Sequence, residues 1–469
     1  MLQHAELANE IIIPSKIKQR KFGSRDKIGY MFGDIANDMF FALIGGYLML
    51  FYTDIYGISA AAAGMILLVA RVVDAIFDVV WGAFIDSRPV GPRGKFRPYL
   101  LFSAIPVTAF GVLTFTHFPV NESWKVIVAS IAYIIWGLAY STINIPYGSL
   151  ASVMTSDPVE RTSLSTFRTL GAILANVFIM VVAPIIIFGS GKSPSAQGFL
   201  TIAAICAVLA NLFYFSSYKL TVERVQAARN AQRKINLAAS LKGFFKNRAL
   251  LGLMLASFGF LASFMTVNAL TPYLFKDYFH APQLIALSGL IGLASSFVAM
   301  PIISPLAKRY GKKETAVIGL VIAFIVNVLM YLLPITSPYV YMALNCISGF
   351  GMAFLNILVW ALVSDCIDNQ ERITGNREEG TVYSVYSLVR KIGQAAAGGI
   401  GGFALVAVGY NSSLPSQSAE VASGIKSIIT LVPALGALVA LVSIYWIYDL
   451  TKKRLFELNA ELTHIREQK

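Results

Sequence analysis

Residues 70–81 read ARVVDAIFDVVW and place two carboxylates, Asp74 and Asp78, inside an apolar stretch that covers residues 60–85. An apolar stretch of this length can cross a bilayer as one helix. The i, i+4 spacing puts both carboxylates on one helical face, with Arg71 three residues before the first. A charge near the membrane midplane costs roughly 2.5–3.5 kcal/mol, so such residues usually handle ions or substrate. The pair therefore indicates a site that handles ions or substrate, and an Arg71–Asp pair that only joins helices is the alternative.

The composition of the whole chain is that of a membrane protein. Of its 469 residues, 56% are hydrophobic and 13% are charged, which is not a soluble globular composition. About twelve apolar segments have transmembrane length, so the predicted fold class is an all-α membrane protein with twelve transmembrane helices in two six-helix halves. The predicted spans are residues 30–55, 61–86, 98–118, 124–150, 165–189, 198–217, 250–276, 284–307, 315–335, 338–364, 381–409 and 424–448.

Basic residues predict the orientation of these spans. Lys and Arg concentrate in alternate loops, so the positive-inside rule places both termini in the cytoplasm and requires an even number of spans. The net charge of +13 follows from this topology and from attraction to anionic lipid headgroups, and it requires no nucleic acid partner. The basic segments are the N-terminal arm and residues 88–97, 219–248, 308–313, 372–377 and 452–454.

The order of the segments predicts two halves that are joined by a basic loop. Two such halves place a substrate site at the midplane between them. Apolar residues recur at helical spacing over residues 455–465, which predicts a short amphipathic helix in the tail. We assign residues 1–218 to an N-terminal six-helix bundle with a cytoplasmic arm, 219–249 to a central cytoplasmic loop, 250–450 to a C-terminal six-helix bundle and 451–469 to a cytoplasmic tail.

The sequence contains no signature of a bound cofactor or of ATP hydrolysis. No Walker or dinucleotide motif is present, and none of the four histidines lies in the middle of a predicted span. The three cysteines form neither a metal nor a disulfide pattern. We therefore expect no cofactor and an ion gradient as the energy source. A membrane enzyme is the least favoured class because no nucleophile–base pair is readable.

Short loops on the predicted cytoplasmic side repeat between the halves. Gly94-Lys95 follows span two, and the basic run 308–313 follows span eight. Glycine permits a tight turn, and the cations can bind helix C-termini or carboxylates across the seam between the halves. This pattern resembles the loop motif of the major facilitator superfamily. A run of small residues, 395–402, predicts close helix packing in span eleven.

Span one contains three aspartates for which different roles are expected. Asp38 lies deep enough in the span to be functional, whereas Asp34 allows either a functional or a capping interpretation. Asp54 lies at the outer end of the span and is predicted to be an exposed interfacial carboxylate.

Span four carries neutral polar groups that suit sugar hydroxyls, with polar contact between helices as the alternative, and spans five and eleven carry cations within apolar segments. Pro146 removes a backbone hydrogen bond and kinks span four, so that Ser141 and Asn144 can face a cavity. Arg168 lies nearly two turns inside span five and can reach the same cavity. A buried Lys391 in span eleven would pair with the two acids of span two.

Together these motifs resemble those of the glycoside–pentoside–hexuronide:cation symporters, a group of the major facilitator superfamily that contains the melibiose and glucuronide carriers. The resemblance covers residues 29–450 and implies the major facilitator fold. Its strongest pieces are Tyr52 to Asp54, Ala70 to Asp78, Gly94 to Pro98, Asn144 to Tyr147, Asp365 to Asp368 and Gly375 to Tyr383.

The resemblance also implies roles for individual residues. The implied cation site consists of Asp74, Asp78 and Ser141. The implied sugar contacts are Asp38, Asn144, Tyr147, Arg168, Lys391 and Asn356. Movement between conformational states would involve Arg71, Gly94, Lys95, Asp365, Asp368 and Arg377.

Departures from the melibiose carrier bear on the coupling ion and on the sugar. Phe77 stands between the two acids where that carrier has an amide, and a phenyl ring cannot ligate sodium, so a proton is favoured over sodium. Asn144, Gly148 and Asn356 replace an acid and two tryptophans of that carrier, which disfavours melibiose. The surroundings of Asn144 are closer to the glucuronide carriers.

The implied function is secondary active transport across the cell membrane by alternating access. A cation, favoured to be a proton, would drive uptake of a glycoside, pentoside or hexuronide, so the expected partners are a small sugar, the coupling cation and membrane lipid. A sodium-coupled sugar symporter is one alternative. A lipid or lysolipid carrier of the same fold is another, and it would need a broad apolar cavity that opens laterally. A sugar sensor would normally need an output domain, and the short tail argues against one.

Overall fold

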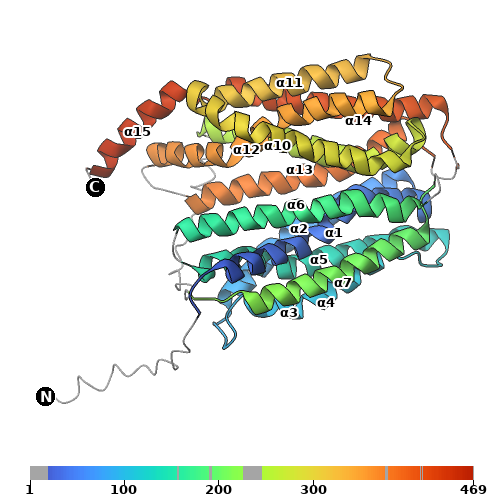
Figure 1. Cartoon of the computed structure of the whole chain (residues 1–469), viewed down its shortest axis with the longest axis horizontal. Helices are drawn as coiled ribbons and strands as arrows, with labels where there is room; N and C mark the ends of the chain where they lie inside the picture. The colour runs from blue at the N-terminus through green and yellow to red at the C-terminus, as the bar shows by residue number, and fades with distance from the viewer. Residues whose placement is uncertain are drawn as a thin grey trace.

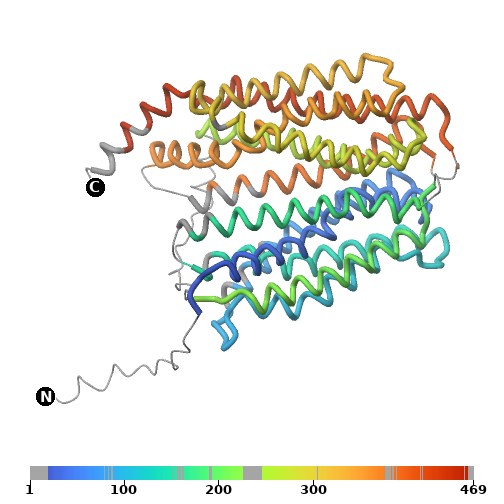
Figure 2. The backbone as a smooth tube through the Cα atoms, viewed as in Figure 1, coloured from blue at the N-terminus to red at the C-terminus, as the bar shows by residue number. Residues whose placement is uncertain are grey.

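The computed structural model describes residues 20–155, 158–189, 193–224, 246–374, 379–411, 414 and 416–467. Long helices run side by side in two groups, α1–α7 and α9–α14 (Figure 1). The same division separates the blue-to-green half of the chain from the yellow-to-red half in Figure 2. We call the end of the bundle where α1 begins the terminal end, because α15 also lies there, and the opposite end the far end.

Each half contains six helical segments of membrane length. The N-terminal half consists of α1 (Ser24–Leu50), α2 (Ala60–Ser87), α3 (Arg97–Phe102), α4 (Ala104–Thr114), α5 (Glu122–Met154), α6 (Pro158–Phe188) and α7 (Ala196–Leu220). The C-terminal half consists of α9 (Arg248–Tyr273), α10 (Ile285–Tyr310), α11 (Lys312–Leu332), α12 (Pro338–Thr374), α13 (Glu379–Ala407) and α14 (Ala419–Val442). The tail helix is α15 (Lys452–Glu467).

The helix count agrees with the twelve predicted spans. In the described ranges, 11 candidate spans are long and apolar enough to cross a membrane, and the remaining predicted span corresponds to α13, a helix of 29 residues. Predicted span three is not one helix, because α3 and α4 meet at Ser103. In a regular helix the ring of Pro106 would clash with the backbone carbonyl of Phe102, four residues earlier, and this clash explains the break.

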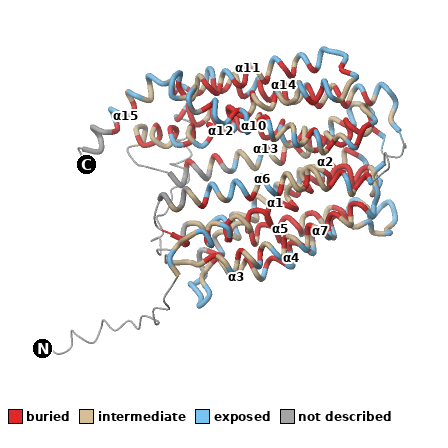
Figure 3. The backbone as a smooth tube through the Cα atoms, in the orientation of Figure 1, coloured by how far each residue is buried: buried red, intermediate tan, exposed pale blue. Residues whose placement is uncertain are grey.

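The outside of the bundle is apolar. Ile76 and Val80 on α2, Phe102 on α3 and Ile105 on α4 are between 62% and 69% exposed. Exposed residues alternate with buried ones along the helices (Figure 3). A contiguous apolar surface of this kind fits contact with lipid rather than with water.

The two halves repeat one backbone motif at the far end. α1 continues into a π-helical turn, η1 (Phe51–Ile55), and α9 continues into another, η2 (Leu274–Tyr278). Two residues after each turn the backbone adopts a positive φ, 74° at Gly57 and 50° at His280. The second half therefore reproduces the local geometry of the first, as expected for internal repeats in transporters.

Glycines bring the two halves into close contact between α2 and α13. A Cβ atom built on Gly402 would lie 2.5 Å from the Cα atom of Gly64, and one built on Gly398 would lie 2.7 Å from the Cβ atom of Leu67. The helix backbones thus meet with almost no side chain between them. This confirms the close packing predicted for residues 395–402. The seam is completed by contacts of α1 with α9 and of α6 with α10.

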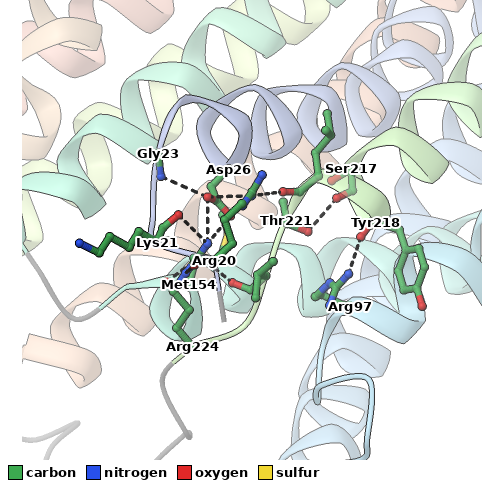
Figure 4. A network of polar contacts seen from close by, with 12 residues as sticks. Arg20, Lys21, Gly23, Asp26, Arg97, Met154, Ser217, Tyr218, Thr221 and Arg224 are labelled. Carbon is green, nitrogen blue, oxygen red and sulfur yellow. Dashed lines mark hydrogen bonds and ion pairs between the residues drawn. The ribbon is translucent and has the colours of Figure 1, made fainter. Parts of the chain in front are cut away.

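A buried carboxylate fastens the terminal end of the N-terminal half (Figure 4). Asp26, in the first turn of α1, is fully buried and forms ion pairs with Arg20 at 2.9 Å and with Arg224 at 3.0 Å. The Arg224 side chain also donates hydrogen bonds to the carbonyls of Arg20 and Met154. The chain before α1, the end of α5 and the segment after α7 are therefore held together.

Glu223, in the same segment, caps α3. Its carboxylate accepts hydrogen bonds from the backbone N–H groups of Lys95, Phe96 and Arg97, each at 2.8 Å. A Cβ atom built on Gly94 would lie 2.5 Å from the Glu223 carboxyl group, and the φ of Gly94 is 95°. Glycine is therefore required at position 94 both by the backbone conformation and by the approach of the cap.

Replacing Glu223 with glutamine is expected to destabilise this end of the protein. A neutral amide offers one acceptor oxygen instead of two, and it loses the attraction to the N-terminus of α3, so we expect a cost of about 1–3 kcal/mol. Thermal unfolding of the purified protein in detergent should show a lower Tm than the wild type. Glu122→Gln is the matched control, because the Glu122 side chain is 81% exposed and its loss should leave the Tm unchanged. Equal Tm values for both variants would contradict the capping role.

The predicted tail helix is confirmed. Leu458 and Leu462 of α15 are buried, and the helix packs against α12. Lys452, in its first turn, donates to the carbonyls of Lys308 and Arg309 at the end of α10. A lysine at this position satisfies carbonyls that have no partner within their own helix.

Candidate functional site

The first acid of the span-two pair, Asp74, is held from two sides. The Ser141 hydroxyl on α5 donates to Asp74 Oδ1 at 2.6 Å. A guanidinium nitrogen of Arg71 lies 3.9 Å from Asp74 Oδ2, and the Arg71 guanidinium also lies 5.1 Å from the ring centroid of Phe41 on α1. The structure therefore brings together Asp74, Arg71 and Ser141 as the sequence predicts, and α5 supplies the hydroxyl.

The second acid, Asp78, forms an ion pair with Lys391. Asp78 lies on α2 and Lys391 on α13, so this pair joins the two halves across the seam. The Asp78 side chain is 16% exposed and the Lys391 side chain is 37% exposed. Each acid of the pair thus has its own cation, and the second cation comes from the other half. Lys391 lies beside Asp78 of the predicted cation site, and its predicted contact with sugar stays a prediction.

Phe77 does not lie between the two carboxylates. Its ring stacks on Trp81 with the centroids 5.8 Å apart and lines a groove formed by α2, α3, α4 and α5. Position 77 therefore contributes no oxygen ligand near Asp74 or Asp78, as the sequence suggested. The position of the ring differs from the expected one, because it lines the groove instead of lying between the acids.

A second charged pair lies on α1 and α6. Arg168 Nε donates to Asp34 Oδ1 at 3.0 Å. The Arg168 side chain is 44% exposed, whereas Asp34 is 5% exposed, so a large part of the guanidinium remains accessible. Asp38 follows one turn later on α1, and its carboxylate has no hydrogen bond to any residue in the described ranges. Asp34, for which the sequence left two interpretations open, is the partner of Arg168.

Tyr147 and Asn144 lie one turn apart on α5. Tyr147 is fully buried, stacks on Tyr30 at 4.7 Å between ring centroids and donates its hydroxyl to the Tyr30 carbonyl at 2.7 Å. The Arg168 guanidinium lies 5.5 Å from the Tyr147 ring. Tyr147 thus packs against Arg168, and its predicted direct contact with sugar stays a prediction. Asn144 is only partly buried, and its predicted contact stays a prediction.

Asn356 lies on α12, in the other half. It is exposed, and Trp360, one turn further on, is 43% exposed. The Arg390 guanidinium lies 5.3 Å from the Trp360 ring centroid. No contact in the described residues joins Asn356 to Arg168 or to Asp78, so the structure leaves its predicted role open.

Four of the residues predicted to act in conformational change, Gly94, Lys95, Asp365 and Asp368, lie near the terminal end, whereas Arg71 lies beside Asp74 in the middle of α2. Gly94 and Lys95 form the turn that Glu223 caps. Asp365 on α12 accepts a hydrogen bond from Lys312 on α11 at 2.6 Å, and Asp368 lies partly buried on the same helix as Asp365. The contacts of Glu223 lie within the N-terminal half, and the contact of Lys312 with Asp365 lies within the C-terminal half. The sequence predicted contacts of the loop cations across the seam, and these printed contacts do not cross it. Arg377 lies outside the described residues.

The far end contains a polar cluster that joins the halves. Asp54 is bound by the Lys276 ammonium group and accepts a hydrogen bond from the Tyr410 hydroxyl at 2.7 Å. Lys276 also donates to Tyr410 at 3.1 Å, and the hydroxyls of Thr53 and Tyr273 lie 2.7 Å apart. Burial raises the pKa of Tyr410, so its hydroxyl remains a donor. We call these five residues the far-end latch.

The predicted exposure of Asp54 is therefore wrong. Its side chain is 9% exposed, because the π-turn η2 of the second half places Lys276 directly against it. A carboxylate at the end of a span usually reaches water, but here the opposite repeat supplies a cation that compensates for burial.

A conventional metal centre is not found in the part of the chain that the structure describes. No group of at least three His, Cys, Asp or Glu side chains lies close enough together there to hold a metal ion. At the seam, Asp78 is instead paired with one base, Lys391.

Comparison with known proteins identifies the family. The model of a family described as MFS/sugar transport protein matches residues 29–452. The chain belongs to this family. A Bacillus subtilis (strain 168) protein named uncharacterized symporter YjmB is 34% identical to this MFS/sugar transport protein, with 97% of this chain and 98% of that protein covered. An Escherichia coli (strain K12) protein named glucuronide carrier protein homolog is 36% identical, with coverage of 93% and 95%.

The fold of this MFS/sugar transport protein also matches solved structures. A bacterial homolog of the human lysosomal transporter Spinster, in an inward-facing and unoccupied conformation, superposes with a TM-score of 0.65 and 11% identity over 92% of this chain and 97% of that one. The chain has the major facilitator fold of two six-helix halves and is a membrane transporter, not an enzyme.

Sequence reasoning did not single out several charged or polar residues of this MFS/sugar transport protein. Lys276, Tyr273 and Tyr410 of the far-end latch lie near the ends of predicted spans, where polar residues are common. The internal repeat is the signal that could have identified Lys276. Residues 51–55 and 274–278 occupy matching places in the two halves, so the Asp54 carboxylate in the first turn has a cation, Lys276, in the equivalent turn of the other half.

Proposed function

We propose that the protein imports a sugar in symport with a proton, by alternating access. In this proposal the terminal end faces the cytoplasm of a cell whose plasma membrane holds the protein, which agrees with the concentration of basic residues at that end. The Asp78–Lys391 ion pair carries the proposal, because it places a titratable carboxylate exactly where the two halves meet.

Proton binding at Asp78 would neutralise the carboxylate and release Lys391. The contact between α2 and α13 at this level would then lose its charge attraction, and the halves could change their relative position. Sugar and proton would favour the same intermediate state, so each would raise the affinity for the other by linkage. The far-end latch would close the outer entrance during release to the inside.

Sodium is the less favoured coupling ion. A hard cation prefers several oxygen ligands, and the described neighbourhood offers the two carboxylates and the Ser141 hydroxyl. Lys391 and Arg71 already occupy these acids, so sodium would have to displace an ammonium or a guanidinium group. A proton needs only one carboxylate oxygen.

The Asp34–Arg168 pair supports a carboxylated sugar as the substrate. Asp34 binds only Nε of Arg168, and the side chain is 44% exposed, so the outer edge of the guanidinium can meet a second carboxylate. Planar guanidinium groups bind carboxylates with two parallel hydrogen bonds. A relative that is named as a glucuronide carrier homolog agrees with a hexuronide, and we place Asp38 and Asn144 at the sugar hydroxyls.

Uptake by proteoliposomes tests the proposal directly. We would offer labelled glucuronide, xyloside and galactoside and vary external pH and sodium independently. A proton gradient alone should drive accumulation, with the glucuronide preferred, and one pH unit should support up to about tenfold accumulation for one proton per sugar. Accumulation that requires sodium would favour the sodium-coupled alternative. No sugar uptake under either gradient would contradict sugar transport and favour the lipid-carrier alternative.

A further inference from the structure

The N-terminal half carries a groove outside the seam. It has a volume of about 770 Å³ and is lined by α2, α3, α4, α5 and the loop that follows α2. Among the residues that the structure describes, none that lines the groove belongs to α1, α6 or the C-terminal half. Alternating access at the seam therefore does not act on this groove, and a molecule bound there would remain in place during transport.

The walls of the groove are two apolar stripes. On α2, Phe77 and Trp81 line the groove, and Phe84 continues their stack beyond it, with neighbouring ring centroids 5.8 and 5.0 Å apart. On the opposite side, Phe102 and Phe110 of α3 and α4 line the groove. Both stripes border the apolar outside of the bundle, where Ile76, Val80 and Ile105 are at least 62% exposed. A slot between such walls suits a hydrocarbon chain.

The mouth of the groove, at the terminal end, is cationic. Arg88 and Lys95 line it, and no acidic residue among the described lining residues does; the nearby Glu223 carboxylate is bound by the backbone N–H groups of residues 95–97. The Arg88 guanidinium lies 4.4 Å from the ring centroid of Phe84, so the positive charge continues the aromatic stripe of α2. Arg88 immediately follows α2, which is the level at which a membrane-spanning helix reaches the lipid headgroups.

We propose that this groove binds one anionic phospholipid. Its acyl chain would lie between the stripes of α2 and α4, and its phosphate would meet Arg88 and the loop that carries Lys95. Charge complementarity selects an anionic lipid, since a cation near the membrane surface favours such lipids roughly fivefold. This binding is independent of sugar transport.

Brominated lipids can test the site, because bromine atoms on acyl chains quench nearby tryptophan. The full-length protein would be reconstituted in phosphatidylcholine, and dibrominated phosphatidylglycerol or dibrominated phosphatidylcholine would be titrated in. The fluorescence of Trp81 is obtained by subtracting the fluorescence of Trp81→Phe from that of the wild type. We expect half-maximal quenching of Trp81 at an about fivefold lower mole fraction of the anionic lipid.

Two variants separate a specific site from general contact with the bilayer. Arg88→Gln should remove the preference for phosphatidylglycerol and leave the phosphatidylcholine curve unchanged. Lys219→Gln is the matched control, because Lys219 lies at the same end on α7, 4.4 Å from the ring centroid of Phe215, and it does not line the groove. Identical curves for the two lipids in the wild type, or an equal effect of both variants, would overturn the proposal.

Discussion

Asp78→Asn is expected to abolish the accumulation of sugar against its gradient. Asparagine cannot exchange a proton, and it leaves Lys391 without its anionic partner. Under an imposed gradient of one pH unit, the internal sugar concentration should rise only to the external value, whereas the wild type can reach about ten times that value. Exchange of internal for external sugar needs no net proton movement and should survive, which counterflow in the same proteoliposomes measures.

The control for this experiment is Glu420→Gln, which removes a carboxylate from an exposed position at the start of α14. It should accumulate sugar as the wild type does. The double variant Asp78→Asn/Lys391→Gln removes the unpaired ammonium group and should exchange sugar at least as fast as Asp78→Asn alone. Full accumulation by Asp78→Asn would show that the coupling proton binds elsewhere.

Lys276→Gln is expected to open the far end. The substitution leaves Asp54 buried without its cation, next to Asp277, whose carboxylate lies 3.4 Å from the Lys276 ammonium group in the intact latch. Removing one partner of a buried ion pair costs about 3–5 kcal/mol. That cost falls on the closed state, so the open state should gain at least a hundredfold in relative population.

Labelling of a cysteine one turn from the latch measures this change. Met49 is buried and lies against Gly401 of the other half, so Met49→Cys, in a chain whose three native cysteines are replaced by serine, reports opening. A membrane-impermeant maleimide should label it far faster when Lys276→Gln is present.

Lys125→Gln is the matched control for the labelling experiment, because Lys125 also lies at the far end but pairs with Glu122, whose side chain is 81% exposed and is not left buried by the substitution. It should not change the labelling rate. The double variant Asp54→Asn/Lys276→Gln should label more slowly than Lys276→Gln alone, since no buried acid then lacks its base. A labelling rate that Lys276→Gln does not change would mean that helix packing alone keeps this end closed.

The sequence predicted the parts of the site that follow from the cost of charge in an apolar helix. Asp74 and Asp78 had to be compensated, and Lys391 was the basic residue expected to reach them. The same argument identified Arg168 but left the role of Asp34 open, because its distance from α6 depends on how α1 and α6 cross. The twelve spans, the two halves and the tail helix followed from apolar length and periodicity.

The failures concern positions where the outcome depended on contacts between distant segments. Asp54 was expected in water, and only the π-turn of the opposite repeat reveals Lys276 beside it. Tyr147 was assigned to sugar from the family motif, and that assignment stays a prediction; packing against Tyr30 buries its ring. Neither a π-turn nor the rotation of a helix about its axis is encoded in hydrophobic periodicity.

The contact between Gly64 and Gly402 has a consequence for the speed of conformational change. Interdigitated side chains must leave their holes before two helices can separate, and each one adds to the activation barrier. At this contact the surfaces are smooth, so the helices can roll or part without a change of rotamer. The rate at which the far end opens should then depend on breaking a few polar bonds rather than on unpacking a core, and polar bonds respond to charge substitutions.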